Sequence, residues 1–431
     1  MKTRKGVEEI TQKIKERIEQ REFMERHMTS EKHFTRKRKL PFASLVLFML
    51  NLIKSTLQKE LTQFIQKFST KHDNITKSAF SQSRLKLKPE AFIELNDVLI
   101  EEFYTDNDEL RWFDFRLLAI DASTLDLPNS EDITNNFGVC HNTGNVITPK
   151  ARISSFYDLL NELIIDSNIT HYGTGEYDLA LKHIPKCNSN DLLIFDRGFG
   201  AIWFMYYLLS NNIDFLIRVQ KNFVSEIGQF WESKEKSKII PIEKCHRKSE
   251  KRLRNLGVNF KPFKIRLVKV QLDNGETEVL VTSLMDSERY HYFIFKDLYF
   301  KRWGIEINID HLKNNIEIEN FTGFSEQAIR QDFYANAFIN NLQSIIARDS
   351  QPAINKVKKN TKYPYKVNRN LSLGYMKDRI VKILTSNKPE YMEELKELFQ
   401  IEPVPIREGR KNPRNFHKLR RKFNMNNRRD L

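Results

Sequence analysis

Cysteine is scarce in this chain, with three residues in 431, at positions 140, 187 and 245. They lack the C-x-x-C spacing of thiolate zinc sites, and Cys140-His141 and Cys245-His246 are isolated pairs without ligand spacing. A disulfide framework and a thiolate zinc centre are therefore excluded as organising features, and a reducing cytosol fits this composition.

Long apolar runs are also missing. The longest, Leu45 to Leu50 with Leu52 and Ile53 after it, is too short to span a bilayer. The N-terminus has no apolar segment of the signal-peptide kind. We therefore expect a buried helix at residues 45–53, no membrane partner and a cytoplasmic location.

Acidic residues are outnumbered, with 56 Asp and Glu against 71 Lys and Arg, which gives a net charge of +15. Such a field attracts polyanions, and nucleic acid is the first candidate, although ribosome-associated and membrane-surface proteins are also basic. A chain of this length exceeds one ordinary core, so we expect two to four domains.

The first hundred residues have a helical pattern after a charged start. Residues 1–40 end in Arg36-Lys-Arg-Lys39 and are interpreted as a solvated arm or an arm that contacts phosphate. Helical periodicity follows over residues 41–104. Within it, Thr76 is a predicted N-cap of a helix that exposes Lys77, Ser78, Gln82 and Arg84. This helix is a candidate second helix of a helix-turn-helix DNA reader, with Lys77 and Arg84 as DNA contacts.

From residue 113 the pattern alternates between strands and helices. Strands are predicted at residues 115–120, 151–157, 163–165, 191–195 and 215–219, and helices at 177–183 and 202–210. This alternation predicts an α/β layer with a largely buried sheet. Residues 220–296 are β-rich, with two strands flanking the hairpin signal Asp273-Asn-Gly275. Residues 325–348 are strongly helical, and the basic tail from Arg407 is expected to be poorly ordered.

Two aspartates share one context. Asp121 and Asp196 each end an apolar run and precede small or turn-forming residues. An aspartate there often serves only a turn or an N-cap, but ligands in α/β sheets bind beyond the carboxyl ends of strands. The two carboxylates are therefore expected to converge.

The segment from Tyr299 to Lys313 supplies the remaining candidates. At about 100° per residue on a helix, Tyr299, Arg302, Glu306 and Lys313 share one face. A solvated face with ion pairs is the alternative. Two strand-end aspartates and a helical glutamate form an oxygen ligand set suited to a pair of Mg²⁺ ions that promote phosphoryl transfer.

These residues resemble a known family. Asp121-Ala-Ser-Thr, Asp196-Arg-Gly-Phe and the Y-x2-R-x3-E-x6-K spacing from Tyr299 to Lys313 are similar to the three signature regions of DDE transposases of the insertion-sequence 4 family. The resemblance covers roughly residues 40–350. Ala122 stands where many relatives carry glycine, a minor departure.

The resemblance implies a fold class and site roles. The fold is expected to be α/β, with an RNase H-like catalytic core interrupted by a β-rich insertion and flanked by helical N- and C-terminal regions. Asp121, Asp196 and Glu306 would be catalytic and would bind two Mg²⁺ ions, for which Mn²⁺ can substitute. Phosphates of DNA would be held by Tyr299, Arg302 and Lys313. Arg197, beside Asp196, is a further candidate contact for a DNA phosphate, and pairing with a nearby carboxylate is the alternative. Trp303 is expected to pack against the sheet.

An insertion is expected because 306 − 196 = 110 residues separate the second and third acidic residues. In the family the insertion helps to form a DNA hairpin, with an aromatic platform for an extruded base. The register of Trp231 is unconvincing for that role, and Tyr290, Tyr292 or Phe293 could stack a base instead.

The leading hypothesis is a bacterial cut-and-paste transposase that binds the terminal inverted repeats of its element, cleaves them and joins them to target DNA. A homodimer would hold two ends, and the enzyme would lie on the nucleoid when bound. Alternatives are an inactive or repurposed DNA-binding protein, an RNase H-like nuclease without strand transfer, and a basic RNA-binding scaffold.

Five regions are expected: a helical DNA-binding region at 1–108, the core at 109–220 and 297–350, the insertion at 221–296, and a helical, basic C-terminal region at 351–431.

Overall fold

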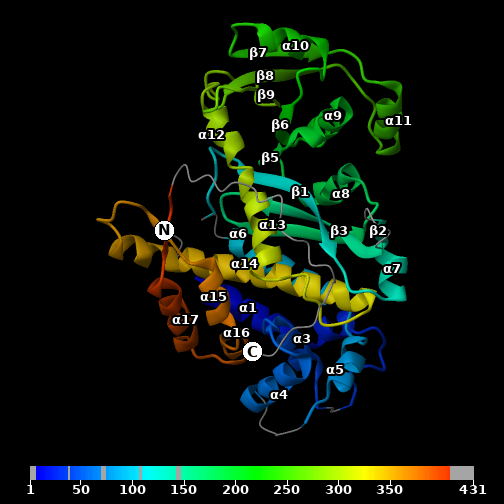
Figure 1. Ribbon diagram of the computed structural model, residues 1–431, viewed down its shortest axis with the longest axis vertical. Coiled ribbons are helices and arrows are strands. Elements are labelled where there is room, and N and C mark those ends of the chain that lie inside the picture. Colours follow the sequence, from blue (N-terminus) through cyan, green and yellow to red (C-terminus); the bar gives the residue numbers. More distant parts are fainter. Residues whose placement is uncertain (1–5, 37–38, 69–73, 106–108, 142–146, 408–431) are drawn as a thin grey trace.

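The computed structural model describes residues 6–36, 39–68, 74–105, 109–141 and 147–407. It is a mixed α/β arrangement with a large central sheet and helical flanks (Figure 1). The tail at residues 408–431, which the sequence predicts to be poorly ordered, lies outside the described residues. Within the described ranges, no helix is both long enough and apolar enough to cross a bilayer.

The N-terminal region is helical, as predicted. Its helices are α1 (Val7–Glu19), α2 (Arg21–His27), α3 (Phe42–Leu50), α4 (Leu57–Phe68), α5 (Lys77–Arg84) and α6 (Glu90–Tyr104). The apolar run at 45–50 lies in the buried helix α3, as expected, but the helix ends at Leu50 and does not extend to residue 53.

The expectation of a solvated arm before residue 40 is wrong for α1. Val7, Ile10, Ile14 and Ile18 recur at helical spacing and are at most 3% exposed. This stripe packs against α6, α14 and α16. The apolar spacing was not recognised in the sequence because charged residues fill the positions between these four.

The central sheet begins with an antiparallel meander and continues with parallel strands. β1 (Arg116–Asp126) pairs antiparallel with β3 (Ile147–Asp158), which pairs antiparallel with β4 (Leu163–His171). On its other side β1 pairs parallel with β5 (Asp191–Phe195), and β5 pairs parallel with β6 (Asp214–Val219). The short strand β2 (Val139–His141) extends the edge beside the start of β3. Each predicted strand of this region is present.

The β-rich segment at residues 221–296 extends this sheet instead of forming a separate one. β9 (Thr277–Thr282) pairs antiparallel with β6, and β8 (Phe263–Gln271) and β7 (Ser237–Ile242) follow outward. The predicted hairpin joins β8 to β9, and Gly275 adopts the left-handed backbone conformation (φ 84°) that this turn requires. A short ribbon, β10 (Tyr365–Lys366) with β11 (Val404–Pro405), lies apart from the sheet.

Helices cover both faces of the sheet. The remaining helical segments are α7 (Glu131–Phe137), α8 (Glu176–His183), η1 (Ile184–Lys186), η2 (Arg197–Phe199), α9 (Ile202–Ser210), α10 (Ser225–Glu232), α11 (Arg247–Asn255), α12 (Ile294–Phe300), α13 (Trp303–Asn314), α14 (Glu326–Val357), α15 (Arg369–Met376), α16 (Arg379–Thr385) and α17 (Glu390–Ile401). Leu118 and Ile120 of β1 pack with the cluster that includes α8 and α9, whereas Ala119 between them belongs to the core around α14. This alternation places β1 in the buried centre of the sheet.

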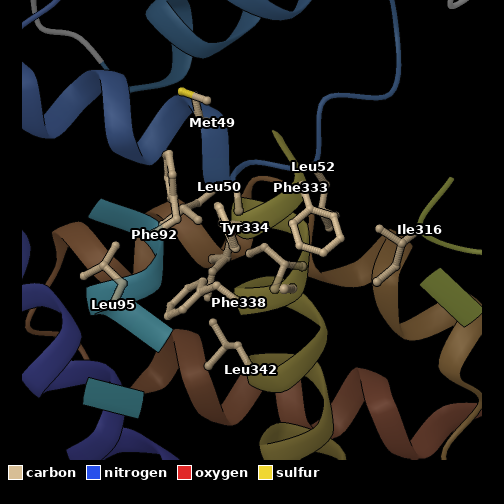
Figure 2. Packing of buried hydrophobic residues seen from close by; sticks show 14 of the residues in the cluster. Met49, Leu50, Leu52, Phe92, Leu95, Ile316, Phe333, Tyr334, Phe338 and Leu342 are labelled. Carbon is tan, nitrogen blue, oxygen red and sulfur yellow. The ribbon is translucent and has the colours of Figure 1, made fainter. Parts of the chain in front are cut away.

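The long helix α14 joins the sheet to the helices from both ends of the chain (Figure 1). Phe333, Phe338 and Leu342 of α14 belong to one buried cluster with Leu50 of α3 and Phe92 of α6 (Figure 2). The same cluster includes residues of α1 and α17. The N- and C-terminal helices therefore share one hydrophobic core.

Candidate active site

Asp121 and Asp196 lie on neighbouring parallel strands. The last registered pair between β1 and β5 is Ala119 with Ile194. Asp121 is two residues beyond Ala119, and Asp196 is two residues beyond Ile194, so the register brings both to the same level (121 − 119 = 196 − 194). The expected convergence of these carboxylates at one edge of the parallel pair agrees with this register.

The local setting of the two aspartates differs. β1 does not end at Asp121, as the sequence suggested, but continues to Asp126 through pairing with β3, where Asp121 is opposite Ser155. Asp196 does end its strand, and its Oδ1 accepts a hydrogen bond of 2.9 Å from the Gly198 backbone N–H. Asp121 is thus fixed within a ladder, and Asp196 by a capped turn.

The predicted helix over Tyr299–Lys313 is divided into α12 and α13. At the junction, the Arg302 N–H bonds to the Tyr299 carbonyl (3.1 Å) and the Gly304 N–H to the Lys301 carbonyl (2.9 Å), which is 3₁₀ geometry. Glu306 lies in the first turn of α13. Because α13 packs on β1, this turn brings a third carboxylate toward Asp121.

The three carboxylates interact electrostatically. Burial raises the pKa of Asp121 to about 6. The Ala122 N–H and the Arg302 cation oppose that rise, while the negative charges of Asp196 and Glu306 add to it. Asp121 therefore lies in a cluster of like charge with one cation at its edge.

Arg302 is that cation, and it is only 8% exposed. Its Nη2 donates to Glu306 Oε1 at 2.7 Å, and its guanidinium lies 5.7 Å from the ring centre of Tyr299 and 5.4 Å from that of Trp303. The Tyr299 hydroxyl and Arg302 Nε are buried without a hydrogen-bond partner within the described part of the chain. The side chains predicted to hold phosphate thus retain unused donors.

Trp303, at the start of α13, is 42% exposed, which is more than its predicted packing against the sheet implies. Ile305 and Ile309 of α13 lie in the core.

Lys313 contacts the strand that carries Asp121. Its Nζ donates to Ser123 Oγ at 2.8 Å and to the Thr124 carbonyl at 2.6 Å. Burial lowers the pKa of Lys313. Farther along, Glu319 Oε1 accepts from the Asp126 backbone N–H at 3.0 Å. The glutamate helix and the segment after it are therefore attached to β1 at two levels.

Asp121, Asp196 and Glu306 are the candidate metal ligands of this site. Among the residues that the structure describes, no three His, Cys, Asp or Glu side chains are grouped closely enough to hold a metal ion. The donor chemistry fits a hard divalent cation, since the cluster offers carboxylate oxygens. One of those carboxylates, Glu306, is engaged by Arg302 in this arrangement.

The remaining residues predicted to contact DNA are exposed, except for Arg84. Thr76 caps α5 as predicted, with Oγ1 accepting from the Ala79 N–H at 3.2 Å, and Lys77, Ser78 and Gln82 are exposed. Arg197, in the turn after Asp196, is exposed as well.

The expected exposure of Arg84 is wrong, because this residue is only 3% exposed. Its guanidinium bonds to Asp332 Oδ1 (2.8 Å), Gln331 Oε1 (2.9 Å) and Thr322 Oγ1 (2.7 Å). Its donors therefore join α5 to α14 and are turned away from solvent.

The aromatic residues proposed to stack on a base differ in their exposure to solvent. Tyr290 is 6% exposed and stacks on Trp112 with ring centres 5.8 Å apart, so its ring is covered. Phe293 is 65% exposed and Tyr292 is 36% exposed. Trp231 is partly buried against the cluster beneath α9.

Some residues of the site have no signal in the sequence. The Tyr177 hydroxyl of α8 donates to the Gly198 carbonyl at 3.1 Å and so supports the turn of Asp196. Glu319 and Ser123 contribute in the same indirect way to the seating of α13. No spacing rule connects these positions to the acidic residues, because each contact depends on strand register or helix docking.

The chain is similar in sequence and structure to known transposases. Residues 112–342, which are 231 of 431, match the family described as "Transposase DDE domain". The chain is 21% identical over 392 residues to "Transposase InsG for insertion sequence element IS4" of Escherichia coli strain K12, covering 88% of this chain and 86% of the relative. A cryo-EM structure of a piggyBac transposase synaptic complex with hairpin DNA superposes with a TM-score of 0.42 at 12% identity, covering 84% of this chain and 75% of that one.

Proposed function

Because the chain belongs to the DDE transposases of the insertion-sequence 4 family, we propose that it binds the terminal inverted repeats of an insertion sequence, cleaves the DNA there and joins the ends to target DNA. The chain is a DNA transposase by family. The cut-and-paste course, the recognition of the repeats and the roles of single residues are the proposal.

The proposed catalytic core is RNase H-like. The strand order β4-β3-β1-β5-β6, with an antiparallel meander followed by two strands parallel to β1, supports this assignment. The proposed insertion at 221–296 then adds β7, β8 and β9 to the β6 edge. In this division the core comprises residues 109–220 and 297–350, between helical regions at 1–108 and 351–431.

Asp121, Asp196 and Glu306 are proposed as the catalytic, metal-binding residues, with two Mg²⁺ ions or Mn²⁺ in their place. Ions held by these carboxylates would supply positive charge at the attacking and departing oxygens of an in-line displacement. The chain's own contribution is to place the three acidic residues on packed elements: β1 and β5 carry two carboxylates at one level, and α13, which packs on β1, carries the third.

Four other side chains are proposed to hold the DNA backbone near the scissile bond: Tyr299, Arg302, Lys313 and Arg197. Tyr299 and Arg302 have buried donors without a partner in the described structure, which suits a phosphate oxygen. Lys313 uses two of its three donors on β1, so one ammonium N–H is available for phosphate. These contacts would orient the scissile phosphate above the carboxylates.

Recognition of the repeats is proposed to involve the exposed face of α5, with Lys77, Ser78 and Gln82 toward DNA. Arg84 is not part of that face. If a hairpin intermediate forms, Phe293 and Tyr292 are the exposed aromatic residues for a flipped base. Two chains are proposed to act as a homodimer in a paired-end complex.

The observation that carries the proposal is the common level of Asp121 and Asp196, with Glu306 near enough to influence the pKa of Asp121. The test is cleavage of a duplex carrying the element's end, with Mg²⁺, by Asp121→Asn, Asp196→Asn and Glu306→Gln. Each variant should lose cleavage and keep DNA binding. Asp310→Asn, on the exposed side of α13, is the matched control and should cleave normally. Full cleavage by any of the three site variants would refute the assignment.

A further inference from the structure

A strongly basic surface covers the outer part of the β-rich segment. Residues 243–264 contain eight Lys and Arg and two Glu, a net charge of 8 − 2 = +6 within 22 residues, whereas the whole chain of 431 has +15. Most of these cations lie on α11, which packs beside α9 (Figure 1). Residues 356–369 also carry a net charge of +6, so the distinguishing feature of residues 243–264 is the arrangement of their cations on one helix.

The cations of α11 are arranged on one side of the helix. Leu253 is fully buried and faces the core. At about 100° per residue, Arg247, Lys248, Lys251 and Arg254 lie between about 100° and 220° from Leu253. All four are exposed, and no ion pair joins any of them to another residue in the described ranges. We call these four residues the α11 basic face.

The inner side of the helix is fixed to the elements that support Asp196. Arg252 pairs with Asp178 of α8 and lies 4.2 Å from the ring centre of Trp203 in α9. It also lies 5.6 Å from the ring of Tyr177, whose hydroxyl bonds to Gly198 in the Asp196 turn. The orientation of the α11 basic face is therefore fixed relative to the candidate active site.

Like charges this dense repel one another and destabilise a helix unless an opposite charge approaches. We propose that the α11 basic face binds the phosphate backbone of duplex DNA that extends from the active site past α8 and α9. This inference rests on the proposed function and adds a second contact surface to it. The contact is sequence-independent, because exposed lysine and arginine neutralise phosphates without reading bases.

The test uses the full chain and a 40-base-pair duplex of mixed sequence, with binding followed by fluorescence anisotropy across a range of salt concentrations. Lys248→Gln/Lys251→Gln should reduce the slope of log K against log salt by about two, since each phosphate contact contributes about 0.9. The matched control is Lys382→Gln/Lys388→Gln, which removes the same charge from exposed positions in and after α16, where acidic residues are interspersed, and should retain the wild-type slope.

An unchanged slope in the folded α11 variant, checked by circular dichroism, would overturn the proposal. An equal change in the control would overturn it too, because net charge alone would then explain the effect. Preferential loss of single-strand binding, measured with a 40-nucleotide strand, would assign the surface to a different occupant. None of these outcomes depends on cleavage, so a failed proposal about Asp121, Asp196 and Glu306 is distinguishable from a failed proposal here.

Discussion

Arg302 and Glu306 form an ion pair across one helical turn, with 2.7 Å between Nη2 and Oε1. The pair joins the residue proposed to bind phosphate to a carboxylate proposed to bind metal. Arg302 is largely buried, whereas the Glu306 side chain is 28% exposed. The arginine therefore pairs with Glu306, and its positive charge opposes the effect of the Glu306 charge on Asp121.

Arg302→Gln should reduce cleavage by about 100-fold or more, since a single preorganised charged donor in an active site has this magnitude. The substitution also removes the cation between the rings of Tyr299 and Trp303, so the free energy of unfolding should fall by about 1–2 kcal/mol. Cleavage rates and urea unfolding measure the two effects. The neighbouring exposed cation gives the control, Lys301→Gln, which should change neither quantity. Wild-type cleavage by Arg302→Gln would contradict the role.

Lys313→Met should lower the free energy of unfolding by about 1–2 kcal/mol even without DNA or metal, because Ser123 and Thr124 lose their donor. A lysine that served only phosphate would leave the DNA-free protein unchanged or more stable. Urea unfolding without nucleic acid therefore separates the two roles. Ser123→Ala removes one of the two acceptors and should produce a smaller loss of stability.

The fold was predictable where the pattern is local. The helix at 202–210 and the strand at 191–195 have their predicted bounds, since each is an apolar run ended by polar or turn-forming residues. The end of β1 was not predictable from residues 121–126 alone. These residues stay extended because they pair with β3, and that information lies in the partner strand.

In the candidate site, too, local features were predictable from the sequence and contacts that depend on packing were not. Asp196 at the end of its strand and Glu306 on its helix are where the sequence pattern indicated. The contacts of Lys313 with β1 and the break at Arg302 depend on how α13 docks. Arg84 is the clearest case, because its partner Asp332 lies 248 residues away and an apolar-periodicity rule cannot connect them.

Arg84→Leu should destabilise the protein by about 3–5 kcal/mol, because it leaves the buried Asp332 carboxylate without its cation. Arg84→Leu/Asp332→Leu should recover part of that loss by removing the unpaired charge. Denaturant unfolding measures both variants. Lys77→Gln, on the exposed side of the same helix, should stay within about 0.5 kcal/mol of wild type. Greater stability of the single variant than of the double variant would contradict the buried pair.

His311 predicts a pH dependence of stability. It lies on α13, is 6% exposed, and its Nε2 is 2.9 Å from Gln343 Oε1 of α14. Burial, with the Arg369 cation adding, lowers the pKa of His311 from 6.5 to about 4, although the Gln343 contact opposes the shift. Between pH 6.5 and 4 the unfolded chain therefore binds a proton that the folded protein does not. The contribution of neutral His311 to the free energy of unfolding is fully present above pH 6.5 and is lost as the pH falls toward 4.

At pH 5 this loss should amount to about 2 kcal/mol relative to pH 7.5. The measurement is urea unfolding at both pH values for wild type and for His311→Gln, which keeps an amide near Gln343 but does not titrate. The difference between the two pH values should shrink by about 2 kcal/mol in His311→Gln. His291→Gln, at an exposed histidine, should keep the wild-type difference. The same pH dependence in His311→Gln and wild type would show that another group dominates, and the assignment of a neutral, buried His311 would be wrong.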